Sequence, residues 1–473
     1  MDKIPTKQID TKPKKQVIDL YEKSERIYVR AYKGIYRNLR NIMAWVLLLM
    51  YFVTPWLSWD DRQAVLFDLP ARQFHVFFLT FWPQDFALLS GLLILFAFAL
   101  FLVTVFAGRA WCGYACFQTV WTYFFMWAEE FAEGSRNDRM KLDEQAMSFA
   151  KFRKKFVKHG LWVLIAIATA ITFVGYFTPI KELLGKFSSL EFGPWESWWL
   201  IFFTVATYMN SGYMREQVCK HMCPYARFQS VMFDPDTLIV TYDEARGEPR
   251  GKGSRKQGSE DLEKGLGDCV DCGVCVAVCP VGIDIRDGLQ YECISCAACI
   301  DGCNEVMERL GKPKGLVRYA TENVLEGQTY HFMRPRLIGY ALAVLVIAGY
   351  IGMQLFARVP IEVDLIRDRQ TLFRDLGQGV IENTYHLKVS NKSQAAITIS
   401  VNLNDVEDYQ YIGQQLLEIA PNATVEQMLR IRIHTDNLHS PKTDITFAVK
   451  SVNDESIQMQ QESRFLAPTD QVL

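Results

Sequence analysis

CVDCGVCVAVCP at residues 269–280 and CISCAACIDGC at residues 293–303 are two copies of one cysteine phrase, and they decide what this chain folds around. Each copy separates its four cysteines by two, two and three residues. That spacing lets a tight loop direct three thiolates at one cube of iron and sulfide, while the fourth cysteine turns to a neighbouring cube. The stretch therefore predicts two [4Fe-4S] clusters in one small domain, and such a pair indicates electron transfer.

The predicted ligand sets are crossed, because the fourth cysteine of each copy serves the opposite cluster, as in bacterial-type ferredoxins. The first cluster takes Cys269, Cys272, Cys275 and Cys303, and the second takes Cys279, Cys293, Cys296 and Cys299. The alternative is a pair of structural zinc sites. Tetrahedral zinc needs only two Cys-x-x-Cys pairs, so it leaves the third cysteine and the Cys279-Pro280 ending unexplained.

The rest of the chain combines a very apolar portion with a polar one, since 50% of its 473 residues are hydrophobic while the mean hydropathy is +0.02 and the net charge is −2. Uncharged runs predict membrane spans at residues 86–107, 160–180, 197–214 and 337–357. A shorter fifth run at 42–57 is flanked by Trp45, Trp56 and Trp59, which suit the interfacial belt of a bilayer.

Charges between these runs predict the orientation. Lys and Arg number eleven in residues 1–40, two in 58–85, nine in 108–159, two in 181–196 and sixteen in 215–336. The positive-inside rule then places the N-terminus and the cysteine-rich domain in the cytoplasm, and residues beyond 357 across the membrane. In a bacterial cell this predicts an inner-membrane protein with a periplasmic C-terminal domain. The charged first forty residues lack the apolar core of a cleavable signal peptide.

The predicted fold is a multi-pass α-helical membrane protein with about five transmembrane helices, a cytoplasmic 2[4Fe-4S] ferredoxin insertion and a C-terminal all-β immunoglobulin-like domain. Residues 358–473 suggest the β-domain because short stretches alternate apolar and polar residues between turn formers. The predicted boundaries are a basic arm at 1–40, a four-helix membrane region at 41–232, a flexible linker at 233–266, the ferredoxin domain at 267–317, a connector at 318–336, the fifth helix at 337–357 and the sandwich at 358–473.

The remaining four cysteines form a second constellation. Cys112 and Cys116 lie in AWCGYACFQTV at 110–120, and Cys219 and Cys223 lie in QVCKHMCPYARFQSV at 217–231. Both are Cys-x-x-x-Cys pairs that follow a predicted span, which indicates a diverged internal repeat. Residues four apart share one helix face, so the two pairs predict a candidate redox or copper site of four soft sulfur ligands at the membrane surface. The alternative is that small cysteines simply pack between helices.

Two further residues lie beside these cysteines in the sequence. His221 lies between Cys219 and Cys223 and is a further candidate metal ligand, although a lone histidine is more often a surface residue. Arg109 precedes Trp111, and we expect its long side chain to reach the lipid headgroups.

Together these motifs resemble the CcoG/FixG/RdxA family of accessory proteins of cbb-type cytochrome c oxidases. The resemblance rests on WCGYAC at 111–116, CKHMCP at 219–224, the duplicated cluster motif and the strand-rich tail, and it covers nearly the whole chain. It implies an oxidoreductase that reduces Cu(II) to Cu(I) during copper delivery, and that binds copper in addition to the two clusters. A departure is Phe117, which stands where the second repeat has Pro224.

The expected partners are membrane lipid, copper ion, oxidase assembly factors or a copper chaperone, and an electron donor that is either a quinol or a soluble reductant. No nucleic-acid partner is expected. One alternative function is a quinol-linked conduit that passes electrons to a partner reductase. Another is a redox-sensing assembly scaffold whose exported domain docks on immature oxidase. Nucleotide chemistry finds no support, because the chain has neither a P-loop nor a GxGxxG turn between a strand and a helix.

Overall fold

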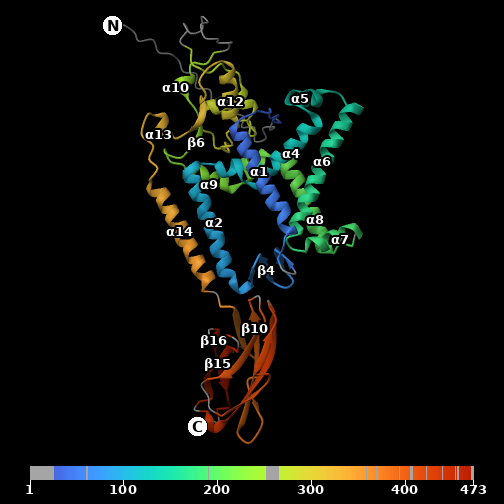
Figure 1. Cartoon of the computed structure of the whole chain (residues 1–473), viewed down its shortest axis with the longest axis vertical. Helices are drawn as coiled ribbons and strands as arrows, with labels where there is room; N and C mark the ends of the chain where they lie inside the picture. Colours follow the sequence, from blue (N-terminus) through green and yellow to red (C-terminus); the bar gives the residue numbers. More distant parts are fainter. Residues whose placement is uncertain are drawn as a thin grey trace, which may run out of the picture. The chain divides into compact units, whose positions relative to one another are not determined.

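The computed structural model describes residues 26–469 apart from 60–61, 190, 252–265, 358, 369–370, 394, 405–407, 422, 439, 453 and 455–456. Most of the predicted basic arm at 1–40 lies outside these residues. The chain divides into two compact units (Figure 1). The first comprises Met1–Leu49, Val103–Ala170 and Trp198–Arg334, and the second comprises Met50–Leu102, Ile171–Ser197 and Pro335–Leu473.

Four helical segments of the described chain are long and apolar enough to cross a membrane. They are Ile35–Trp56, Phe86–Ala107, Phe149–Val174 and Pro335–Phe356. Each overlaps a predicted span, and the helix α2 (Phe86–Ala107) has the predicted bounds. The helix α1 (Ile35–Val53) begins seven residues before its predicted start, and α6 (Phe149–Val174) begins eleven before, because basic residues at membrane ends continue the helix into the headgroup region. The chain is therefore a membrane protein.

The predicted span at 197–214 is interrupted. The α-helix α8 (Pro194–Thr207) stops after 14 residues, and the chain continues as the π-helix η3 (Tyr208–Met214). A π-helical turn often marks a functional position in a helix. Here it brings the backbone of Gly212 against Trp162, since a Cβ atom on Gly212 would lie 3.0 Å from two ring atoms. Five complete spans and their sidedness stay a prediction.

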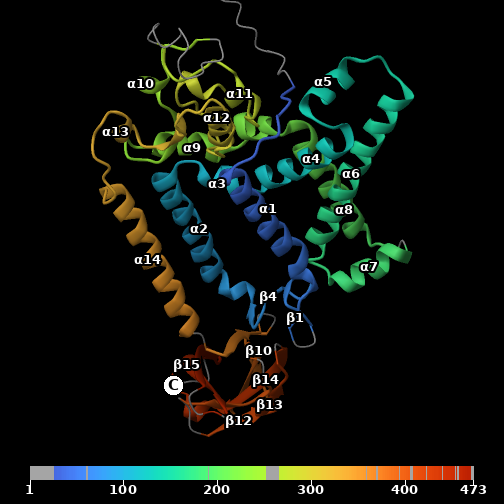
Figure 2. The same cartoon turned by 45° about the horizontal axis from the view of Figure 1, so that its top comes forward.

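The first unit holds every cysteine of the chain. The unit contains η3 and the larger parts of α1, α6 and α8, whose remaining turns belong to the second unit. Its other elements are α3 (Ala110–Tyr114), α4 (Phe117–Glu133), α5 (Arg136–Glu144), the π-helix η4 (Val218–Met222), α9 (Pro224–Met232), β6 (Ile239–Tyr242), α10 (Glu244–Gly247), α11 (Val274–Ala277), η6 (Ile285–Asp287), α12 (Ala298–Arg309), β7 (Val317–Ala320) and α13 (Glu322–Leu325). Figure 2 shows α9, α11 and α12 in the upper part of the picture, with the short helix α3 below them.

The cysteine-rich domain extends beyond its predicted range. Strand β6 pairs antiparallel with β7, with Val240 opposite Tyr319, and both strands pack on the apolar cluster that contains Cys269 and Cys275. The segment 233–266 was predicted to be a flexible linker, but its first part supplies β6 and α10, and residues 252–265 lie outside the described chain. The predicted linker is corrected to this extent, because the small cysteine domain needs a strand pair to close its core.

In the second unit, α2 packs against α14 (Pro335–Phe356), where Phe98 and Phe101 both contact the ring of Tyr340. The segments between the spans form further elements that the sequence analysis did not predict. These are η1 (Thr54–Trp56), β1 (Ser58–Trp59), β2 (Arg62–Gln63), β3 (Val65–Asp68), β4 (Gln73–Val76), β5 (Leu79–Phe81), η2 (Pro83–Asp85) and α7 (Ile180–Ser189).

The C-terminal residues of this unit form two facing antiparallel sheets, with strand orders β12-β14-β10-β8 and β13-β11-β15-β16. The strands are β8 (Ile361–Arg367), β9 (Arg374–Asp375), which pairs with β10, β10 (Val380–Asn391), β11 (Ile397–Leu403), β12 (Tyr409–Ile412), β13 (Leu416–Ile419), β14 (Thr424–His434), β15 (Lys442–Ser451) and β16 (Gln458–Leu466), with a short 3-10 turn η7 (Thr435–Asn437). The predicted β-sandwich is confirmed.

The sandwich core follows the predicted alternation, because successive strand residues point to opposite faces. Leu387 and Val389 of β10 and Ile399 and Val401 of β11 are all buried. Tyr385 of β10 and Phe447 of β15 meet between the sheets with ring centroids 5.1 Å apart. The core contains no cysteine among its described residues, so an inter-sheet disulfide plays no part in it.

Candidate electron-transfer site

The eight motif cysteines line two adjacent cavities in the predicted combinations. One cavity is lined by Cys269, Cys272, Cys275 and Cys303, and the other by Cys279, Cys293, Cys296 and Cys299 together with Cys275. Four sulfur ligands around each cavity fit a [4Fe-4S] cluster, and the apolar side chains that complete the walls fit its low polarity. Below, the first set is the first cluster site and the second set is the second cluster site.

The two cluster loops share one backbone design. In each loop, the residues on both sides of the second cysteine have a positive φ, between 48° and 64°. They are Asp271 and Gly273 around Cys272, and Ser295 and Ala297 around Cys296. Non-glycine residues rarely adopt this conformation, and it is concentrated at ligand-binding loops. Gly273 and Ala297 also begin α11 and α12 as their N-cap residues. The duplicated sequence therefore folds as a duplicated loop, each copy bending its cysteines around one cavity.

Burial shapes the chemistry of these thiols. It raises the pKa of Cys275 to about 11 and those of Cys293 and Cys303 to about 12. Without iron, these thiols are thus neutral at physiological pH, and cluster assembly must release their protons. Cys272 is the exposed member of the first site, whereas the cysteines of the second site are buried or half-buried.

The membrane-side cysteine pairs also repeat each other, although not in the predicted way. The N–H of Cys116 donates to the carbonyl of Trp111, and the N–H of Cys223 donates to that of Val218, each five residues back. Cys116 and Cys223 have an extended backbone and are the N-cap residues of α4 and α9, respectively. The expectation that each pair shares one face of a continuous helix is wrong, because the helix breaks at the second cysteine of each pair.

The four thiols nevertheless form one neighbourhood, named here the membrane cysteine group (Cys112, Cys116, Cys219 and Cys223). Burial, together with the nearby thiol of Cys116, raises the pKa of Cys112 to about 12 and that of Cys219 to about 11. The thiol of Cys112 donates a hydrogen bond of 3.3 Å to Oε1 of Gln229. Among the described residues, no three His, Cys, Asp or Glu side chains lie close enough to hold a single metal ion, and this includes the membrane cysteine group.

The membrane cysteine group touches the second cluster site. Cys112 packs against the apolar cluster that contains Ile294 and Cys296. Gly113 permits this approach, since a Cβ atom there would lie 2.7 Å from the carbonyl oxygen of Ile294 and 2.9 Å from the Cα of Cys296. A Cβ atom essentially never lies so close to backbone, so α3 can adopt this position because residue 113 is glycine.

Arg109 lies at this contact and not at the headgroups. Its side chain is 3% exposed, and its guanidinium donates to the carbonyl oxygens of Ala226 in α9 and of Cys293, the latter at 3.5 Å. The expectation that it extends to the membrane surface is therefore wrong. Sequence reasoning missed this role because an arginine at the end of an apolar run carries no signal of what will fold over it.

The remaining candidate ligand, His221, is exposed. It lies with Met222, Cys223 and Arg227 along an open groove of about 440 Å³. Its imidazole is thus beside one cysteine of the group but outside the packed region that contains Cys112. The structure neither closes a ligand set around His221 nor buries it.

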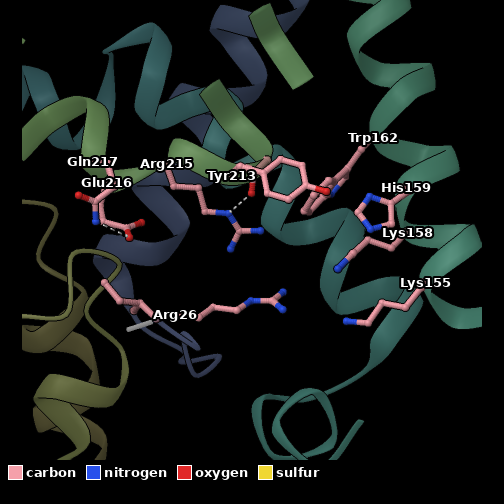
Figure 3. A pocket seen from close by; sticks show the side chains of 11 residues that line it. Arg26, Lys155, Lys158, His159, Trp162, Tyr213, Arg215, Glu216 and Gln217 are labelled. Atoms are coloured by element: carbon pink, nitrogen blue, oxygen red, sulfur yellow. Dashed lines mark hydrogen bonds between the residues drawn. The ribbon is translucent and has the colours of Figure 1, made fainter. Parts of the chain in front are cut away.

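A second cavity of about 440 Å³ lies beside η3 and is lined by Arg26, Lys155, Lys158 and Arg215, with Trp162 and Tyr213 among the aromatic walls (Figure 3). The cations pair with buried carboxylates: Arg215 contacts Glu129 at 2.9 Å, and Lys158 contacts Glu133 at 2.8 Å. Arg215 also donates from Nε to the carbonyl of Gly212 at 2.8 Å. This ion network fixes the π-helical segment that leads to Cys219.

Comparisons with known proteins agree with this architecture. A family model described as "4Fe-4S dicluster domain" matches residues 214–322, and one described as the "IG-like fold at C-terminal of FixG" matches residues 351–468. The chain is 39% identical over 421 residues to the nitrogen fixation protein FixG of Rhizobium meliloti, covering 81% of this chain and 80% of that protein.

Two further relatives come from Cereibacter sphaeroides. Protein RdxB is 40% identical over 412 residues (84% of this chain, 86% of RdxB), and protein RdxA is 39% identical over 389 residues (79% of this chain, 81% of RdxA). Among solved structures, a FixG-related protein from Vibrio parahaemolyticus is 29% identical and covers 23% of this chain and 95% of its own, with a TM-score of 0.21.

Proposed function

Because the chain belongs to the FixG family, alongside RdxA and RdxB, we propose that it is an iron-sulfur oxidoreductase that reduces Cu(II) to Cu(I) at the membrane cysteine group. The reduced ion is then passed on for assembly of a cbb-type cytochrome c oxidase. The proposal includes the bacterial inner membrane as its location, with the cluster domain in the cytoplasm and the β-sandwich in the periplasm.

The observation that carries the proposal is the contact between Cys112 and the second cluster site. Cys112 packs on the same apolar cluster as Cys293 and Cys296, and Gly113 brings the two backbones together. Electrons held at the second site would therefore have the membrane cysteine group as an adjacent acceptor site.

The chemistry of both sites suits a one-electron metal reduction. Each bound [4Fe-4S] cluster supplies one electron at a time. One electron taken from the second site converts one Cu(II) to one Cu(I), and no proton is needed for the balance. Thiolate sulfur prefers the product ion Cu(I), and because burial raises the pKa of Cys112 and Cys219, binding of the ion would release their protons. The open groove beside His221 is lined by Cys223, so one thiol of the group borders solvent.

The test is cupric reductase activity of the purified full chain in detergent, under anaerobic conditions and with a Cu(I)-specific chelator. Dithionite reduces the protein and is removed before Cu(II) is added. We expect Cu(I) to form in proportion to the reduced clusters, and the double variant Cys112→Ser/Cys219→Ser to lose at least about ten-fold in rate while its iron and sulfide content is unchanged.

Two results would count against the proposal. The first is a wild-type protein whose clusters stay reduced when Cu(II) is added. This would favour the alternative of a conduit that passes electrons from quinol to a partner reductase. The second is an unchanged rate in the double variant, which would place copper reduction elsewhere. A matched control is Ser188→Ala in α7, an exposed polar side chain in the other unit.

A further inference from the structure

The two cluster sites differ in the charge that surrounds them. At the second site, Arg109 is 3% exposed and Arg40 of α1 is 6% exposed, so both cations are buried. Arg109 donates to the carbonyl of Cys293, and its charge offsets part of the burial that raises the pKa of this cysteine. Arg40 interacts electrostatically with the thiol of Cys296, and its guanidinium stacks 4.6 Å from the ring centre of Tyr123.

Neither of these arginines has a carboxylate partner. Among the described residues, no Asp or Glu forms an ion pair with Arg40 or Arg109, and the partners of Arg109 are neutral carbonyl groups. Burying a charge without a counter-charge is costly, so such groups normally pair with an opposite charge. The thiolates and bound cluster of the second site are the negative charges that these two positions face.

The first site has the opposite arrangement. Arg286 lines its cavity but is held by two carboxylates, with Nη1 2.6 Å from Asp271 and Nη2 2.6 Å from Asp284. Together the three side chains carry one negative charge. A second group beside Cys269, in which Asp268 pairs with Arg246 and Lys312, carries one positive charge (two cations and one carboxylate), but it is half-exposed and screened by solvent.

We propose that Arg40 and Arg109 make the second cluster site easier to reduce than the first, and that this difference directs electrons from the first site to the second. Reduction adds one negative charge, and a buried, unpaired cation stabilises it far more than a cation already neutralised by carboxylates. The step moves one electron, so the first site is oxidised by one electron and the second is reduced by one. Arg40 and Arg109 are positioning residues, because neither touches the copper ion.

The direction agrees with the position of both sites. Cys272 is exposed, so the first site is open to an electron donor, while the second site is packed against Cys112. The inference rests on the proposed function for the identity of the final acceptor. The order of the two reduction potentials, however, depends on the cluster domain and on Arg40 and Arg109, and it can be measured without copper.

The experiment is a potentiometric titration of the full chain in detergent, without copper, followed by electron paramagnetic resonance. Cys272→Ser and Cys296→Ser assign the two signals to their sites. We expect the second site to be reduced first as the potential falls. At the wild-type midpoint of the second site, Arg109→Gln should lower its reduced-to-oxidised ratio at least about ten-fold, which is 59 mV for one electron. The first site should shift much less.

Arg109→Lys keeps the charge and should keep the order, which separates charge from packing. The control is Arg309→Gln, an exposed arginine of α12 paired with Glu305, and it should shift neither site. If the first site is reduced before the second, or if Arg109→Gln shifts both sites equally, the inference is wrong. If Arg109→Gln fails to bind clusters, Arg40→Gln provides the same comparison.

The outcomes also separate this inference from the proposed function. If the second site is reduced first but the protein does not reduce Cu(II), the arginine effect stands and copper is not the acceptor. If the protein reduces Cu(II) but the first site is reduced before the second, the proposed function stands and the arginine effect is wrong.

Discussion

Gly113 of α3 lies so close to Cys296 that a Cβ atom on the glycine would lie 2.9 Å from the Cα of the cysteine. This contact joins the membrane-side helices of the first unit to its cluster domain. It connects Cys112 with the loop of Cys296, and these two cysteines are 184 residues apart along the chain (296 − 112). The predictions below follow from this contact, from the crossed ligand sets and from the independence of the β-sandwich.

Gly113→Ala should slow electron transfer to Cu(II) while leaving both clusters in place. The new methyl group cannot fit against the Ile294 carbonyl, so α3 must move by several tenths of an ångström. Displacements of this order in a reacting pair cost about ten-fold in rate. Stopped-flow absorbance of the reduced clusters after mixing with Cu(II) measures the rate.

The matched control for this variant is Gly185→Ala in α7, where a Cβ atom meets nothing within 4 Å. Equal rates in the Gly113→Ala variant and in wild type would show that the contact is irrelevant to electron transfer.

Cys303→Ser should disturb the cluster held by Cys269, Cys272 and Cys275, although Cys303 belongs to the second motif. The cavity of the first site includes Cys303, and the cavity of the second does not. The measurement is the electron paramagnetic resonance spectrum of the reduced variant beside those of Cys272→Ser and Cys296→Ser. We expect Cys303→Ser to resemble Cys272→Ser. A spectrum like that of Cys296→Ser would mean that the ligand sets are not crossed.

Removing iron should loosen the cluster domain and leave the β-sandwich folded. The domain's core surrounds its cysteines, with Val278, Ile283 and Ile294 among the buried residues, and the metal contributes much of its folding free energy. Hydrogen exchange with mass spectrometry should show exchange at 267–317 rising at least about ten-fold after chelation. The peptides of the sandwich in the same sample are the control, and loosening of both regions would contradict the prediction.

Phe447→Ala should destabilise the sandwich by about 3–5 kcal/mol, because it removes a fully buried ring that packs on Tyr385. Hydrogen exchange of the full chain at residues 361–466 measures the loss. The cluster spectrum should be unchanged, since the β-domain has its own apolar core. Val452→Ala, at an exposed position after β15, is the control and should have almost no effect.

The grouping of the eight cysteines around two cavities and most of the architecture could be predicted because their signals are local. Cysteine spacing alone indicates the crossed sets around Cys279 and Cys303, and an uncharged run of hydrocarbon length indicates α2. Period-two alternation likewise indicates strands such as β10 and β11. In each case, residues near in sequence carry the physical constraint.

The junction between the sites could not be predicted, because it depends on contacts between distant segments. Arg40 lies in α1, whereas Arg109 and Gly113 lie at the start of α3 and within it. These residues approach Cys293 or Cys296 only after the chain has folded. The helix breaks at Cys116 and Cys223 were missed for a related reason, since a Cys-x-x-x-Cys pair fits either a helix face or an N-cap.

The most direct test of the account is freeze-quench electron paramagnetic resonance of the anaerobically reduced protein mixed with one equivalent of Cu(II). The account predicts that the signal of Cu(II) and the signal of a reduced cluster disappear together, one electron for one ion. A persistent Cu(II) signal beside clusters that remain reduced, or a preparation that contains zinc without iron and labile sulfide, would contradict it.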